Sequence, residues 1–142
     1  MTAVERTLAR LHARLRFSAP AYLGSAAPAS IRGEEAYRDY LARVRKAYAD
    51  AEQALAEALR DRRAPTDTGT FPMRFAAWND LSPKYLAGRL RQELVADREA
   101  LAALRRTLPE FSPEIRIIDE FSAQLEDAVV EADALLASAK KT

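Results

Sequence analysis

The chain has 142 residues, a length typical of one domain and sufficient to bury a hydrophobic core. Its formal net charge of +1 indicates no particular partner, and the absence of cysteine excludes disulfides and thiolate metal ligands. Alanine, leucine, arginine and glutamate dominate and favour helix, whereas few glycines, threonines and valines remain to build strands. We therefore expect residues 1–142 to form a single all-α domain.

The first predicted helix begins at Thr2 and ends near Phe17. Thr2 and Glu5 have the spacing of a capping box, in which each side chain caps the backbone N–H of the other residue. An apolar stripe follows at alternating steps of four and three residues: Val4, Leu8, Leu11 and Leu15. Residues 18–30 combine two prolines with small residues, which predicts an extended connection.

The second predicted helix has the most regular heptad pattern in the sequence, which is typical of a coiled coil. Ser30 is its expected N-cap, and the helix extends to about Arg63. A short extra helical turn is expected over 72–80, within the 64–81 connection that follows. The core positions of the second helix are Tyr37, Tyr40, Leu41, Val44, Ala47, Tyr48, Ala51, Leu55, Ala58 and Leu59.

Two Ser-Pro pairs predict where the last two helices begin, because serine is a good N-cap and proline suits the first helical position. Ser82 precedes the third helix, which Pro109 stops, and Ser112 precedes the fourth, which continues to about Ala139. The inner face of the third helix is Leu86, Leu90, Leu94, Leu101, Leu104 and Leu108. The inner face of the fourth is Ile115, Ile118, Phe121, Leu125, Val129, Ala132 and Leu136.

Four amphipathic helices can bury their stripes only against each other, which predicts an antiparallel up-down-up-down four-helix bundle. The first and third helices are basic and the fourth is acidic, so in that ring the acidic helix lies between the two basic ones. The row Arg6, Arg10 and Arg14 points away from the first helix's core, and we expect it to pair with the acidic helix. The alternative is contact with an acidic protein or a nucleic-acid backbone.

Few side chains offer catalytic or metal-binding chemistry. His12 is the only histidine, lies at the boundary of the first apolar stripe and is interpreted as structural. Di-metal bundles need inward glutamates and Glu-x-x-His pairs, which this pattern lacks, and the glycines are too scattered for a phosphate-binding loop. We therefore expect neither an enzyme nor a cofactor or metal ion.

Asp97 interrupts the leucine stripe of the third helix at its centre. A buried carboxylate must be hydrogen-bonded or protonated. Matching the midpoints of two antiparallel helices places Tyr48 nearest, with Tyr40 as the alternative donor. The expected role is a polar contact that fixes the register of the helices, and the alternatives are an exposed Asp97 or a functional pocket.

The 64–81 connection is longer than a turn requires and carries an aromatic stretch. Phe71, Phe75 and Trp78 share one face if this stretch is helical, and that face is expected to plug the open end of the bundle. The alternative is a partner-binding edge made of residue types enriched in interface anchors: Phe71, Met73, Arg74, Phe75 and Trp78.

The leading functional hypothesis is a non-enzymatic protein-interaction module, such as an adaptor, chaperone-like protein or assembly subunit. The alternatives are a nucleic-acid-associated regulatory protein that uses the arginine row, and a small-molecule-binding bundle with a pocket near Asp97 and the tyrosines. Long heptad stripes also permit association into a homo-oligomer. Neither a signal peptide nor a membrane span is predicted, so we expect a cytoplasmic protein without membrane contact.

Overall fold

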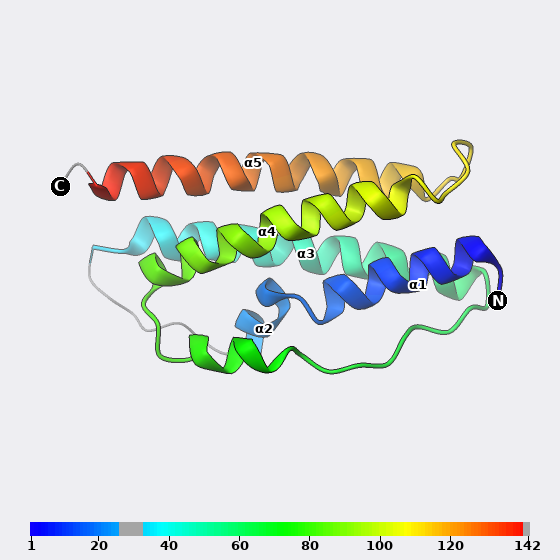
Figure 1. Ribbon diagram of the computed structural model, residues 1–142, viewed down its shortest axis with the longest axis horizontal. Helices are drawn as coiled ribbons and strands as arrows, with labels where there is room; N and C mark the ends of the chain where they lie inside the picture. The colour runs from blue at the N-terminus through cyan, green and yellow to red at the C-terminus, as the bar shows by residue number, and fades with distance from the viewer. Residues whose placement is uncertain (26–32, 141–142) are drawn as a thin grey trace.

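A computed structural model describes residues 1–25 and 33–140, and within these ranges the chain is all-α. Two short elements, α2 (Ala19–Ser25) and the 3-10 helix η1 (Met73–Trp78), accompany a four-helix bundle (Figure 1). The bundle helices are α1 (Ala3–Arg16), α3 (Glu35–Asp61), α4 (Pro83–Arg105) and α5 (Ile115–Lys140). The predicted all-α bundle and the extra helical turn in the connection are confirmed. None of the described helices combines the length and the apolarity needed to cross a membrane.

The helix ends follow local sequence signals. Thr2 Oγ1 accepts a hydrogen bond from the Glu5 N–H at 3.1 Å, and Glu5 Oε2 accepts one from the Thr2 N–H at 3.2 Å, so the predicted capping box is present. Pro83 opens α4 after an extended Ser82, as predicted. The expected N-cap Ser30 lies outside the described residues.

The C-terminal end of α3 turns through a left-handed residue. Arg63 has a φ of 55°, and the Ala64 N–H donates to the Leu59 carbonyl at 2.9 Å. This six-residue closure is the Schellman motif, which satisfies a carbonyl that the ending helix leaves free. It redirects the chain into residues 64–72.

The helix α2 occupies part of the 18–30 range, where the sequence pattern predicts an extended connection. Ser18 caps this helix, because its Oγ accepts a hydrogen bond from the Ala21 N–H at 3.4 Å and its carbonyl accepts one from the Tyr22 N–H at 3.0 Å. Pro20 lies in the first turn, where a missing N–H costs no intrahelical hydrogen bond. The extended connection is therefore wrong for Ala19–Ser25, because proline breaks a helix only in its interior.

The helices are arranged around the bundle in a different order from the predicted up-down-up-down ring. α4 and α5 are antiparallel neighbours, as predicted, but α5 packs on its other side against α3, and α1 packs against α3 and α4 (Figure 1). α3 and α4 run in the same direction, opposite to α1 and α5. The direction order is up-down-down-up, because residues 62–82 run back along the bundle instead of turning at its end.

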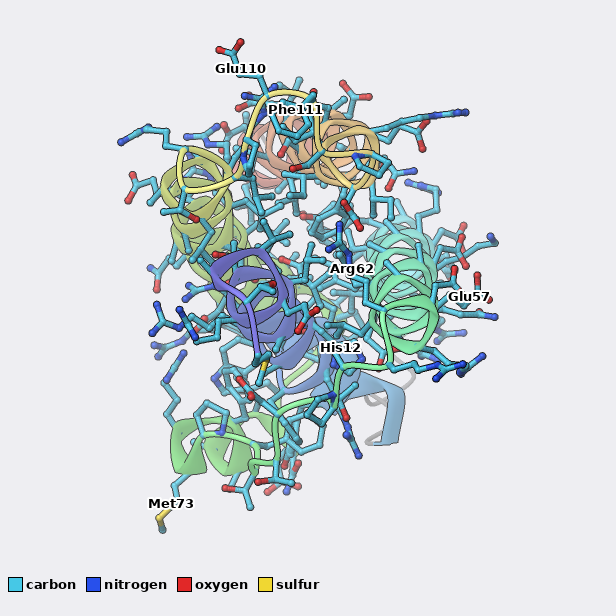
Figure 2. The ribbon with its side chains drawn as sticks, turned by 90° about the vertical axis from the view of Figure 1, so that its right-hand side faces the viewer. His12, Glu57, Arg62, Met73, Glu110 and Phe111 are labelled. Atoms are coloured by element: carbon cyan, nitrogen blue, oxygen red, sulfur yellow. The ribbon has the colours of Figure 1, made fainter. Side chains whose placement is uncertain are left out.

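The ion pairs of α5 follow this order. Its acidic side chains pair with α4 and α3, whereas α1 lies diagonally across the bundle, as the end-on view in Figure 2 shows. The predicted pairing of the acidic helix with the third helix is therefore confirmed, and the pairing with the first is wrong. Each exposed pair contributes at most about 1 kcal/mol. These pairs are Arg91–Asp133, Arg98–Glu126 and Arg105–Asp119 with α4, and Arg43–Glu131 with α3.

The helix α1 is much shorter than its neighbours, and α2 with η1 completes its layer (Figure 1). At about 1.5 Å per residue, α1 spans roughly half the length of α3. Aromatic rings join the two short elements, because the Tyr22 and Phe75 centroids are 5.7 Å apart. Within η1 the Phe75 and Trp78 centroids are 5.1 Å apart. Phe75 and Trp78 are only 1% and 7% exposed. The predicted burial of Phe75 and Trp78 is confirmed, but Phe71 precedes η1 and is half-buried. The predicted plug at the open end of the bundle is wrong, because η1 covers the side of the bundle beyond the end of α1 (Figure 1).

This packing predicts that Trp78→Ala lowers the free energy of unfolding by about 3–5 kcal/mol, because a large buried ring leaves a cavity. The control in the same short helix is Met73→Ala, which removes an exposed side chain and changes stability by less than about 0.5 kcal/mol. Urea unfolding followed by far-UV circular dichroism measures both. Equal stabilities for the two variants would contradict the burial of this segment.

Candidate functional site

Three helices meet at the carboxylate of Asp97. This residue belongs to α4 and is 4% exposed. Tyr48 of α3 donates its hydroxyl to Asp97 Oδ2 at 2.5 Å, and Arg14 of α1 donates Nε–H to Oδ1 at 2.8 Å. The predicted burial of Asp97 and its contact with Tyr48 are confirmed. The prediction assumed antiparallel helices, whereas α3 and α4 are parallel, but the midpoints of two helices face each other in either case.

The surroundings of Asp97 oppose its ionisation. Burial raises the pKa of Asp97 above its ordinary value of 3.8, and the Tyr48 hydrogen bond and the Arg14 charge lower it by less than burial raises it. Burial and the Asp97 charge both raise the pKa of Tyr48, so the phenol keeps its proton and remains a donor. Because folding raises the pKa of Asp97, its ionised form costs stability at neutral pH, and this cost disappears as the pH falls below 3.8.

A cavity of about 410 Å³ lies against Asp97, between α1, η1 and α4. We call it the Asp97 cavity. Its charged groups are two ion pairs, because Arg74 donates Nε–H and Nη2–H to the two oxygens of Glu93, each at 3.0 Å. The uncharged part of the wall combines apolar side chains with the hydroxyls of Ser18 and Thr70. The lining residues that matter for binding are Arg14, Phe17, Pro72, Arg74, Glu93 and Asp97.

A second hollow of about 450 Å³ lies between α3 and the segment from the end of α1 to α2. Its cations, Arg16, Arg45 and Lys46, are all exposed and therefore solvated. Tyr48 also borders it, but the hydroxyl of this residue is engaged by Asp97. No buried charged side chain lines this hollow, so we place the candidate site at the Asp97 cavity.

The residues proposed as a partner-binding edge do not form one exposed patch. Phe75 and Trp78 are buried, Phe71 is half-buried, and Arg74 is engaged with Glu93. Only Met73 projects freely, with 92% of its surface exposed (Figure 2). The segment contributes its aromatic side chains to the core and to the Asp97 cavity.

The three arginines of the predicted row have different surroundings. Arg14 turns towards α4 and pairs with Asp97, contrary to the expectation that it points away from the core. Arg6 donates Nη1–H to the Met1 carbonyl at 2.8 Å, and Arg10 is exposed. The expected pairing of this row with the acidic helix is wrong, because α1 is diagonal to α5.

Other buried polar groups lie outside the Asp97 cavity. His12 is buried, and its Nε2 is 3.0 Å from Glu52 Oε1, between α1 and α3 (Figure 2). Among the described residues, the Tyr40 hydroxyl has no hydrogen-bond partner, so this alternative donor does not reach Asp97. Glu114, a buried residue that the sequence pattern does not single out, accepts from Arg62 Nε at 2.7 Å.

The sequence reasoning missed two parts of the site. Arg14 is absent from the predicted surroundings of Asp97. In the structure α4 packs against α1, runs in the opposite direction and contacts the side of α1 that carries Arg14. Glu93 is also missed. It lies four residues before Asp97, one helical turn away on the same face, and this spacing is a signal that was present in the sequence.

Comparisons with protein-family models, with curated proteins and with solved structures found no match. Bundles with one long crossover connection include ferritin-like folds, in which inward glutamates and histidines bind metal. Within the described part of the chain, no group of three or more His, Cys, Asp and Glu side chains is placed to hold a metal ion.

The Asp97 network predicts non-additive effects of substitution. Tyr48→Phe and Asp97→Leu each leave one buried polar group without its partner, so each lowers the free energy of unfolding by about 1–3 kcal/mol. The double variant removes both groups, and its loss is smaller than the sum of the single losses. Urea unfolding of the four proteins at pH 7 measures this coupling. Strictly additive losses would show that Tyr48 and Asp97 do not interact.

Proposed function

We propose that the protein is a non-enzymatic small-molecule-binding bundle whose ligand lies in the Asp97 cavity. The observation that carries this proposal is the position of a buried, doubly hydrogen-bonded carboxylate beside a cavity of about 410 Å³. Ligand sites are typically cavities of about 300–1,000 Å³ with largely apolar walls and a few fixed polar groups. Phe17 and Pro72, both half-buried, supply the apolar wall that a ligand can reach, and the two ion pairs supply the polar groups.

The burial of the aromatic segment is the reason for preferring this function to the protein-interaction module that leads the sequence hypotheses. Interface anchors are large side chains that a partner can reach, and Phe75 and Trp78 are inaccessible. The interaction module is the second candidate, now centred on the exposed Met73. Loss of captured host protein in Met73→Ala, a variant expected to fold normally, would favour it.

The nucleic-acid alternative loses support because Arg14 is committed to Asp97 and Arg6 to a backbone carbonyl. Of the predicted row, Arg10 alone offers an uncommitted charge among the described residues. A single exposed arginine gives little of the phosphate-neutralising charge that such binding requires. A cytoplasmic location and association into a homo-oligomer remain predictions from the sequence.

The proposal is tested by filling the cavity. Ala13 of α1 lines it, so Ala13→Phe places a ring inside, whereas Ala102→Phe on the exposed face of α4 is the matched control. Ligand-observed NMR with a library of small organic fragments measures binding to each folded variant. We expect a subset of fragments to bind the wild type and Ala102→Phe but not Ala13→Phe. A library without ligands, or ligands that bind all three proteins equally, would overturn the proposal.

A further inference from the structure

The two terminal nitrogens of Arg14 are unused donors of the Asp97 cavity. Arg14 donates a hydrogen bond to Asp97 through Nε, and among the described residues its Nη1 and Nη2 donate none. The Arg14 side chain is 39% exposed and lines the cavity, so a ligand can reach this end of the guanidinium. Two parallel N–H groups at this end match the two oxygens of a carboxylate.

The other charged side chains of the cavity leave the terminal nitrogens of Arg14 without a hydrogen-bond acceptor. Glu93, the one other acid in the lining, has both oxygens occupied by the bidentate contact with Arg74. Arg74 itself lies over the Phe75 ring, 4.8 Å from its centroid, which fixes the guanidinium against the wall. The donors left over are the Arg14 terminal nitrogens, Arg74 Nη1 and the hydroxyl of the exposed Thr70.

We propose that the ligand of the Asp97 cavity is an organic carboxylate with an apolar body about the size of one ring. Its carboxylate lies on Nη1 and Nη2 of Arg14, and its body packs against Phe17 and Pro72. This inference rests on the proposed function, since it names the class of ligand that the same cavity takes. It adds a direction of binding, with the charged end towards α1 and α4.

In this arrangement Asp97 and Tyr48 are positioning residues. Asp97 occupies Nε of Arg14 and leaves its terminal nitrogens available to a ligand, and Tyr48 of α3 holds Asp97 in place. A long arginine side chain that is fixed before binding loses less conformational entropy when the ligand arrives. The buried carboxylate is thus used to orient a cation that recognises a second carboxylate.

Three probes of one shape separate the ligand classes: 3-phenylpropanoate, its neutral amide 3-phenylpropanamide, and the cation 3-phenylpropylamine. Titrations of the full chain, followed by isothermal calorimetry or NMR, give the dissociation constants. We expect the carboxylate to bind about tenfold or more tightly than the amide, because a charged hydrogen-bond pair contributes more than a neutral one. The amine is expected to bind most weakly.

Variants of α1 and α4 test the assigned residues. Arg14→Gln is expected to remove the preference for the carboxylate while the amide still binds, and Asp97→Leu to reduce the same preference. The control is Arg10→Gln, which changes an exposed arginine one turn away and leaves all three affinities unaltered. A purely structural role for Asp97 would weaken both probes equally and leave their ratio constant, which would overturn its positioning role.

The outcomes distinguish this inference from the proposed function. If the fragment library yields cavity ligands but the amide or the amine matches the carboxylate, the cavity binds small molecules and the carboxylate class is wrong. The class is also wrong if the library succeeds and none of the three probes binds. If neither library nor probes bind, the proposed function fails together with the inference.

Discussion

The carboxylate of Asp97 is the constraint on which the arrangement of the bundle depends. It is buried, it cannot remain without partners, and its two oxygens receive their hydrogen bonds from two different helices. Tyr48 thereby fixes α3 against α4, and Arg14 fixes α1 against α4 at the same level of the bundle. A leucine can pack in any register of the apolar stripes, whereas a carboxylate with two specific donors favours the register in which both hydrogen bonds form.

The shortness of α1 also shapes the fold, because it determines the path of the connection between α3 and α4. Because it covers only part of the groove between α3 and α4, the chain must fill the rest with other segments, and it uses α2 and η1. The 62–82 connection can reach this place only by running back along the bundle, which makes α3 and α4 parallel. The Asp97 cavity lies where α1, this connection and η1 meet. The connection that makes α3 and α4 parallel therefore also forms part of the candidate site.

The fold was predictable where local signals decide it, and the predicted site was partly correct. The apolar stripes and the capping box determine the four helices, and the polar residue inside the leucine stripe leads correctly to Asp97 and Tyr48. The order of the helices was not predictable from the stripes, because each stripe fits any neighbour. The length of the 64–81 connection was the available signal: a turn between antiparallel neighbours needs about 2–8 residues, whereas a crossover needs many more. Arg14 was missed for the same reason, since its partner depends on which helix lies beside α1.

The most direct test of the Asp97 network is the exchange of the Arg14 Nε–H proton with water, measured by nitrogen-15 NMR on the full chain, with Arg14→Lys identifying the signal. A buried acceptor protects a donated proton, so we predict slow exchange for Arg14 Nε–H and fast exchange for the exposed Arg10. In the Asp97→Leu variant the Nε–H proton of Arg14 is expected to exchange as fast as that of Arg10. Equally fast exchange of both arginines in the wild type would contradict the central place given to Asp97.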